Sequence, residues 1–222
     1  MGVRIMHESR SSDELSELLR KSYAHTLSGT IAIDGRDGVG KTTLAVALQA
    51  ALGGIVISLD DFVLENCGGY VPHLKIAGLK ATLERSSRPC IVDGVCTLAA
   101  LDRVSHRHDV LIYVKRLGSC GYWQDEDTCD PTEPVDELIG RLAEEAAAVA
   151  RFEAEQSGEA VPEEEKPALT PLREEIIRYH ARYRPSRRAE IIFMRMEDAT
   201  AWSCRHCATA QAERRRIGHE ST

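Results

Sequence analysis

Apolar residues follow two alternating patterns along this chain, short continuous runs and longer stretches with helical periodicity. Five continuous runs predict buried strands: GTIAID (29–34), IVISL (55–59), CIVDG (90–94), VLIYVK (110–115) and EIIFMR (190–195). The periodic stretches predict helices over 11–26, 41–52, 74–85, 135–156 and 172–183. Continuous apolar strands that alternate with helices indicate an α/β fold whose parallel sheet is covered on both faces.

The same patterns suggest how the chain is organised. Ser11 followed by Glu14 forms a capping-box pattern at the start of the first helix. We expect one α/β domain over residues 1–198, with an inserted helical lid over about 117–172. The remaining residues, 199–222, form a basic stretch that we expect to be loosely ordered.

Length and composition narrow the classes of protein that fit. The 222 residues, with 43% apolar and 28% charged side chains, suit a single globular domain. The net charge of -7 argues against general binding to nucleic acid, because an acidic surface repels a phosphate backbone. No apolar run has the length of a membrane span or the form of a secretory leader.

Cysteine usage predicts a reduced, cytoplasmic protein. The seven cysteines are odd in number and mostly isolated. Cys204 and Cys207 form a Cys-x-x-Cys pair, but a structural zinc site needs four ligands, so we expect no metal there.

One glycine-rich segment, IAIDGRDGVGKTTLA (31–45), points to phosphate binding. It contains the spacing Gly-x-x-x-x-Gly-Lys-Thr between a predicted strand and a predicted helix, which is the context that this motif requires. The glycines allow backbone N–H groups to turn toward phosphate oxygens, and the helix N-terminus adds positive charge. The residues expected to contact ATP are Gly35, Asp37, Gly38, Val39, Gly40, Lys41, Thr42 and Thr43.

Two further segments, SLDDFVL and IVDGVC, resemble the uridine kinase-like P-loop kinases, the relatives of phosphoribulokinase and pantothenate kinase. The matching residues are Asp60-Asp61-Phe62 and Asp93-Gly94-Val95, and RAEIIFMR is similar to the last strand of that family. The resemblance covers roughly residues 29–115 and 178–195. It implies a P-loop NTPase three-layer sandwich with a five-stranded parallel sheet in the order 2-3-1-4-5. It also implies transfer of the γ-phosphoryl group of ATP, with Mg²⁺, to a small hydroxylated acceptor.

The resemblance also implies roles for individual side chains. Lys41 would stabilise charge on the phosphates and Asp60 would accept the proton of the attacking hydroxyl. The expected Mg²⁺ residues are Thr42, Asp60 and Asp93. The alternative for both aspartates is structural, since a carboxylate at a strand end also caps the following turn.

The predicted lid departs from the family pattern. Uridine kinases carry an arginine-rich lid, whereas the stretch after Lys115 and Arg116 is acidic. We expect Arg116 to act on the transferring group, with Lys115 as its companion. A second cluster of candidate cations is Arg182, Arg184, Arg187 and Arg188, for which a solvated basic face is the alternative.

The acceptor segment between the second and third strands is shorter than in the family, so uridine itself is not implied. The residues expected to shape an acceptor pocket are Asp37, Asp61, Tyr70 and His73. Asp37 is included because DGVGKTT resembles the loop of thymidylate kinases, in which an acidic residue contacts the acceptor sugar. A nucleoside is one of several acceptors that fit.

Two other functions stay open at this point. The chain is compatible with a regulatory or assembly protein that binds ATP, hydrolyses it weakly and meets a protein partner at the acidic lid. A nucleic-acid-processing ATPase is disfavoured by the net charge. The expected partners are a nucleoside triphosphate and a small hydroxylated substrate; we expect no membrane partner and leave a homodimer open.

Overall fold

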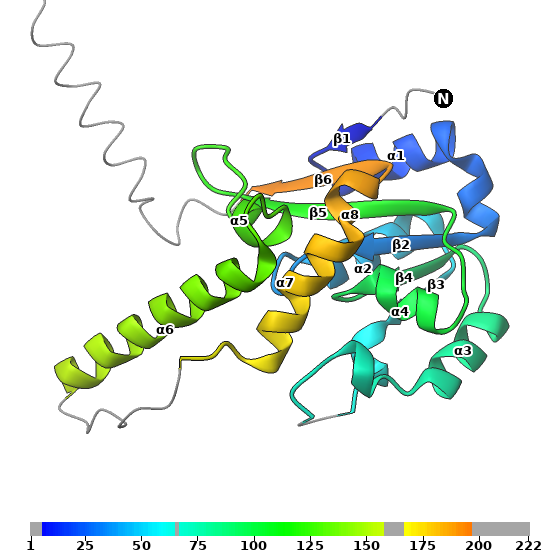
Figure 1. Ribbon diagram of the computed structural model, residues 1–222. Coiled ribbons are helices and arrows are strands. Elements are labelled where there is room, and N and C mark those ends of the chain that lie inside the picture. Colours follow the sequence, from blue (N-terminus) through cyan, green and yellow to red (C-terminus); the bar gives the residue numbers. More distant parts are fainter. Residues whose placement is uncertain (1–5, 65–66, 158–166, 197–222) are drawn as a thin grey trace, which may run out of the picture.

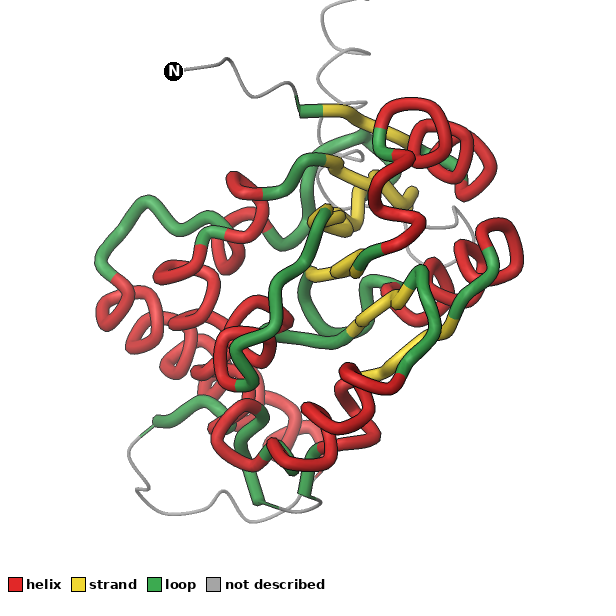
Figure 2. The backbone as a smooth tube through the Cα atoms, turned by 90° about the vertical axis from the view of Figure 1, so that its right-hand side faces the viewer, coloured by secondary structure: helices red, strands yellow, loops and turns green. Residues whose placement is uncertain are grey.

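The computed structural model describes residues 6–64, 67–157 and 167–196 as a single parallel sheet between two layers of helices (Figures 1 and 2). The strands are β1 (His7–Ser9), β2 (Thr30–Asp34), β3 (Ile55–Ser58), β4 (Cys90–Asp93), β5 (Val110–Leu117) and β6 (Ile191–Met196). They form a six-stranded sheet in the order β1-β6-β5-β2-β4-β3, and every pair of neighbours is parallel. The expected α/β class with a parallel sheet covered on both faces is therefore confirmed.

The sheet has six strands and not the expected five, so its number of strands and its full order differ from the expected 2-3-1-4-5. The difference is β1, which pairs with β6 at the edge of the sheet. The five strands that the sequence predicts lie in the succession β3-β4-β2-β5-β6. β1 has the sequence His-Glu-Ser and contains no apolar residue, so no hydrophobic pattern could mark it.

Eight α-helices occur in the described parts of the chain. They are α1 (Ser12–Ser22), α2 (Lys41–Leu52), α3 (Ile76–Arg85), α4 (Thr97–Arg103), α5 (Glu126–Cys129), α6 (Val135–Ser157), α7 (Pro171–Tyr183) and α8 (Pro185–Arg188). Three 3-10 helices join them, η1 (Ala24–Ser28), η2 (Leu59–Phe62) and η3 (Val71–His73). The helices missed from the sequence are α4, α5 and α8, each of seven residues or fewer and too short for a helical period to show.

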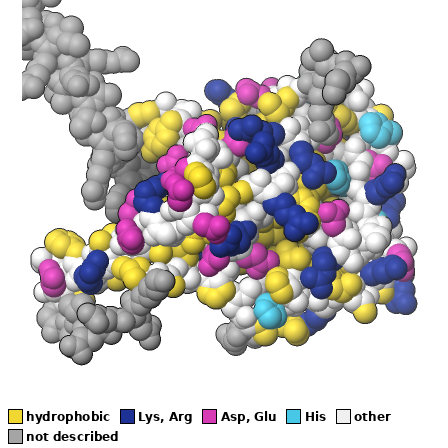
Figure 3. All heavy atoms as spheres, viewed as in Figure 1, with side chains coloured by type: hydrophobic (Ala, Val, Ile, Leu, Met, Phe, Trp, Pro, Cys, Tyr) yellow, Lys and Arg dark blue, Asp and Glu magenta, His cyan; other side chains and the backbone are white. Residues whose placement is uncertain are grey.

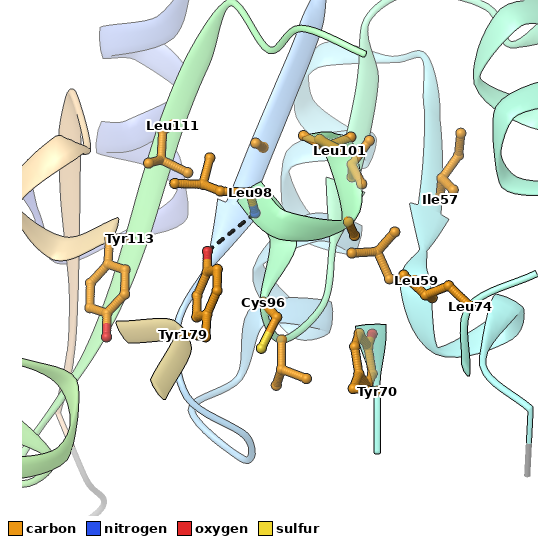
Figure 4. Packing of buried hydrophobic residues seen from close by; sticks show 14 of the residues in the cluster. Ile57, Leu59, Tyr70, Leu74, Cys96, Leu98, Leu101, Leu111, Tyr113 and Tyr179 are labelled. Atoms are coloured by element: carbon orange, nitrogen blue, oxygen red, sulfur yellow. Dashed lines mark hydrogen bonds between the residues drawn. The ribbon is translucent and has the colours of Figure 1, made fainter. Parts of the chain in front are cut away.

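Each face of the sheet carries its own hydrophobic core. Leu15 of α1 and Leu44 of α2 pack against Ile31 and Ile33 on one face of the sheet. The opposite core contains residues of α3, α4 and α7 together with Ala32 on the other side of β2. Figure 4 shows part of this core, with Leu98 and Leu101 of α4 and Tyr179 of α7. Because successive strand residues point to opposite faces, two covered faces require the continuous apolar runs seen in the sequence.

The predicted boundary of α1 is confirmed. The Ser11 hydroxyl accepts a hydrogen bond from the backbone N–H of Glu14 at 3.1 Å, which satisfies a donor at the open helix end. The helix is shorter than the predicted 11–26, because η1 follows it after Tyr23.

The segment expected to be a lid contains α5 and α6. The first part of α6 packs on α7 through Leu138 and Ile177, and the rest extends away from the sheet (Figure 1). Val149 and Phe152 on this outer part are exposed. The predicted tail over 199–222 and its Cys204-Cys207 pair lie outside the described residues.

Two expectations about the environment of the chain can be compared with the structure. No helix in the described ranges is long and apolar enough to span a membrane. Cys120 is disulfide-bonded, so the expectation of a fully reduced chain is wrong at this residue. Cys90, Cys96 and Cys129 are buried thiols.

Candidate functional site

The carboxyl ends of β2, β3 and β4 border a cleft of about 440 Å³ at the start of α2. Its lining residues are Asp37, Gly38, Gly40, Lys41, Thr42, Thr43, Asp60, Tyr70, Asp93, Gly94, Val95, Leu172 and Arg195. Nine of the predicted site residues are therefore in one place: Asp37, Gly38, Gly40, Lys41, Thr42, Thr43, Asp60, Tyr70 and Asp93. Ligands commonly bind at this edge of an open α/β sheet.

The glycine loop, residues 35–40, takes backbone conformations that favour glycine. Gly38 has φ 71° and Gly40 has φ 92°, and a side chain at Gly35 would meet the carbonyl oxygen of Val114 at 2.8 Å. Val39 is buried in the core between α1, α2 and the sheet, so it anchors the loop and does not line the cleft. α2 begins at Lys41, directly after the loop, and its first turn borders the cleft.

Lys41 is buried and its ammonium group lies against the loop. Its Nζ donates a hydrogen bond to the carbonyl oxygen of Arg36 at 2.5 Å. Burial lowers the pKa of Lys41, and the nearby carboxylates of Asp34 and Asp60 oppose this shift. In this position the Lys41 ammonium group can donate to a phosphate oxygen bound at the loop in place of the Arg36 carbonyl oxygen.

Thr42 and Asp93 form a direct contact between α2 and β4. The Thr42 hydroxyl donates to Oδ2 of Asp93 at 2.7 Å. The other oxygen of Asp93, Oδ1, is buried and has no hydrogen-bond partner among the described residues. Burial raises the pKa of Asp93, because removal from water penalises its charged form.

This pair fits a magnesium ion bound together with a nucleotide. An unpartnered carboxylate oxygen beside a hydroxyl offers two hard oxygen ligands. No cluster of three or more His, Cys, Asp or Glu side chains that could hold a metal occurs in the described ranges. Mg²⁺ in nucleotide sites commonly takes one or two protein carboxylates and completes its shell with phosphate and water.

Asp60 lies across the cleft and is oriented by Tyr70. The Tyr70 hydroxyl donates to Oδ1 of Asp60 at 2.6 Å. Burial and this hydrogen bond raise the pKa of Tyr70, which keeps the phenol protonated as the donor. None of the described residues forms a hydrogen bond with the second oxygen of Asp60.

The backbone around Tyr70 is held by α7. Glu175 accepts hydrogen bonds from the backbone N–H groups of Tyr70 and Val71 at 2.6 and 2.9 Å. A side chain at Gly94 would lie 2.8 Å from the Tyr70 hydroxyl, so this ring position requires glycine there. In the Asp93-Gly94 motif, Asp93 thus supplies a carboxylate to the site, and Gly94 leaves the space that the Tyr70 hydroxyl needs.

Asp34 is a buried carboxylate beneath the loop that sequence reasoning missed. Its Oδ1 accepts the backbone N–H of Gly35 at 2.7 Å, and its Oδ2 accepts a short hydrogen bond from the hydroxyl of Tyr179. The Tyr179 oxygen in turn accepts the N–H of Leu98 at 3.2 Å (Figure 4). Burial is the main cause that raises the pKa of Asp34 to about 6.

Arg195, near the end of β6, lines the cleft and was not among the site residues expected from the sequence. Its Nη1 donates to the carbonyl oxygen of Val39 at 3.2 Å, close to Gly40. The only signal in the sequence was its place at the end of the last predicted strand. It brings a second cation to the glycine loop.

The expected lid cations do not line this cleft. Arg116 is bound by Asp125, with Nη2 to Oδ1 at 3.1 Å, and Asp125 also pairs with Arg36 of the loop at 2.5 Å. Lys115 lies over the Trp123 ring, 3.9 Å from its centroid. In the second cluster, Arg187 pairs with Asp130 at 2.8 Å.

Two acceptor residues expected from the sequence also lie outside the cleft. Asp61 is exposed on η2, and His73 is on η3 beside Gly69. Asp37 and Tyr70 are the members of that set that the structure brings to the cleft.

A scan against protein-family models and a search of curated proteins both found no match for this chain. The case for a function therefore depends on the chemistry of the cleft.

Proposed function

We propose that this protein is a P-loop NTPase of the kinase type, an ATP- and Mg²⁺-dependent phosphotransferase that acts on a hydroxyl group of a small molecule. The observation that carries the proposal is the meeting, in one cleft, of the glycine loop, the Thr42–Asp93 pair and the Asp60 carboxylate. Of the three elements, the Asp60 carboxylate is the one that supports transfer chemistry, because it can accept the proton of an attacking hydroxyl.

The chain supplies the phosphate site from its backbone and two cations. Loop N–H groups and the N-terminus of α2 favour negative charge. Lys41 and Arg195 add positive charge, and each donates to a carbonyl oxygen of the loop segment, that of Arg36 and that of Val39. Thr42 and Asp93 are the side chains that fit Mg²⁺, which would neutralise charge on the phosphates when bound.

Asp60 supplies the proton chemistry of the proposed reaction. Its free oxygen accepts the proton of the acceptor hydroxyl while that oxygen bonds to the γ-phosphorus and ADP leaves. Tyr70 fixes the carboxylate through the opposite oxygen. The acceptor therefore enters the cleft beside Asp60 and Tyr70.

The regulatory alternative draws support from one observation. Asp125 is buried and binds both Arg36 and Arg116, so the insert engages cations that a kinase lid would direct at the phosphates. In a regulatory protein, this contact would couple the conformation of the glycine loop to that of the insert. ATP hydrolysis stimulated by a protein, with no phosphorylated acceptor, would favour this function.

The test is an ATP-consumption screen with Mg²⁺ against nucleosides, sugars, vitamins and small alcohols. We expect phosphorylated product from one acceptor class. Asp60→Asn should lower transfer at least about a hundredfold and leave ATP affinity almost unchanged, the usual size of a general-base effect. Lys41→Ala should abolish turnover.

Asp61→Asn is the matched control, because Asp61 is the exposed neighbour of Asp60 and does not line the cleft. Its transfer rate should stay close to that of the wild type. Equal losses in the two variants, or full activity in Asp60→Asn, would remove the assignment of the base.

A further inference from the structure

A second pocket of about 470 Å³ lies between α4 and α7 and takes no part in the proposed reaction. α4 contributes Ala99 and Arg103 to its lining, and α7 contributes Tyr179, Arg182 and Tyr183. Figure 3 shows Lys and Arg side chains gathered on this face around hydrophobic ones. The pocket thus combines an apolar interior with basic side chains.

The arginines of this pocket differ in their availability. Arg178 is engaged by Glu174 and Asp136, each at 2.8 Å. No ion pair joins Arg103 or Arg182 to another part of the described chain. The guanidinium carbon of Arg182 lies over the Tyr183 ring, 5.6 Å from its centroid, and Arg182 lines the pocket.

The two carboxylates that line the pocket already have donors. Glu175 accepts the backbone N–H groups of Tyr70 and Val71. Asp102 is hydrogen-bonded to Tyr183, whose pKa is raised by burial first and then by this carboxylate. The charged donors of the pocket are guanidinium groups, which prefer carboxylate or phosphate oxygens.

Aromatic rings define the rest of the pocket. Tyr179 and Tyr183 are stacked, with centroids 5.0 Å apart and planes at 28°. Figure 4 shows the Tyr179 ring beside Cys96, which also lines this pocket. An apolar or aromatic ligand body would gain contact area with these walls.

We propose that the pocket between α4 and α7 binds a small molecule with an aromatic or apolar body and one carboxylate or phosphate group, held by Arg103 and Arg182. This proposal does not rest on the proposed transferase activity. The site is separate from the glycine loop, although the two share a wall: Tyr70 lines the cleft and Val71 lines the pocket.

The experiment measures binding of simple probes to the full chain by calorimetry, without nucleotide. Phenyl phosphate and benzoate carry a ring and an anion, benzyl alcohol lacks the charge, and inorganic phosphate lacks the ring. We expect phenyl phosphate or benzoate to bind at least about tenfold tighter than both benzyl alcohol and inorganic phosphate. Whichever of the two binds more tightly shows whether the pocket prefers a phosphate or a carboxylate group.

Three variants locate the binding site. Arg103→Gln/Arg182→Gln should weaken binding of the better probe about tenfold or more, since charge-assisted hydrogen bonds are lost. Lys41→Ala, which removes the loop cation, should leave it unchanged. Arg107→Gln is the matched control, an exposed arginine near α4 that does not line the pocket.

Three results would overturn the proposal. The first is unchanged affinity in the double arginine variant when circular dichroism shows it folded. The second is loss of binding in Lys41→Ala, which would move the anion to the glycine loop. The third is benzyl alcohol binding as tightly as both anionic probes, or no binding of either anion.

Discussion

Thr42 donates its hydroxyl hydrogen to Asp93 across 2.7 Å and so joins the first turn of α2 to the end of β4. The two residues are far apart in the sequence, and parallel pairing of β2 with β4 brings their elements together. The contact leaves the other Asp93 oxygen without a partner among the described residues. This geometry is the basis of the first prediction.

Thr42→Ala should weaken Mg²⁺-dependent ATP binding about tenfold, because one hard oxygen ligand and one hydrogen bond are lost. Thr42→Ser keeps the hydroxyl and should bind like the wild type. Calorimetry with Mg²⁺ and then with EDTA checks the origin of the effect. A loss of equal size in EDTA would show that Thr42 acts on the fold and not through the metal.

Gly94→Ala should destabilise the protein by about 1–3 kcal/mol, as overpacking of a filled site usually does. The new methyl group would lie 2.7 Å from Cβ of Leu59 and 2.8 Å from the Tyr70 hydroxyl. Urea unfolding measures the change. Adding Tyr70→Phe removes the clashing oxygen and should recover part of the loss.

Gly140→Ala is the control for this prediction. Gly140 lies within the helix α6, and a side chain there meets nothing within 4 Å. It should stabilise the protein by about 0.5–1 kcal/mol through helix propensity. Destabilisation in both variants would show that crowding at Gly94 is not the cause.

Asp34→Asn should change how stability depends on pH. Folding raises the pKa of Asp34 from 3.8 to about 6, so between these values the folded state binds more protons than the unfolded state. Wild-type stability therefore falls as pH rises from about 4 to about 6, by about 3 kcal/mol from this group. As pH rises from about 4 to about 6, the free energy of unfolding of Asp34→Asn should increase relative to that of the wild type. Above about pH 6 the difference between the two should stay constant.

His180 contributes a slope of the opposite sign. Its Nε2 is 3.0 Å from the Tyr113 hydroxyl, and burial is the main cause that lowers its pKa from 6.5 to about 4. Here the folded state binds fewer protons, so stability is lost as pH falls from about 6.5 to about 4. His180→Gln should not lose stability in this way. Its free energy of unfolding should therefore increase relative to that of the wild type as pH falls toward about 4.

Urea unfolding at several pH values checks both slopes. In the wild type the opposite pH dependences of Asp34 and His180 largely cancel. Each single variant removes one of them, so that the pH dependence due to the other group can be measured. Asp127→Asn, at an exposed carboxylate of α5, should follow the wild-type curve. Parallel curves for Asp34→Asn and the wild type would contradict the assignment of Asp34.

Sequence patterns predicted those parts of the fold and site that depend on local order. Five strands, the start of α2 at Lys41 and the meeting of strand ends followed from apolar runs and one motif. Asp34 was not found, because its role depends on Tyr179, a partner far along the chain. β1 was missed because edge pairing with β6, and not its own side chains, defines it.

The expected role of Arg116 also shows the limit of charge counting. The insert is acidic in composition, which predicts a repulsive cover over a nucleotide. One of its carboxylates, Asp125, is instead buried against Arg36 and Arg116. Composition gives the number of charges, whereas only the folded chain shows which of them are already paired.

The pairing of β1 with β6 affects how the protein is made. His7 to Ser9 are synthesised long before their partners, Ile191 to Phe193, because more than 180 residues separate the two strands in the chain. Until then one edge of β5 has open N–H and C=O groups, a surface that favours aggregation. A chain interrupted before residue 191 would retain the cleft-forming strands β2, β3 and β4 but lack β6, so the edge of β5 would stay open and β1 would have no partner strand.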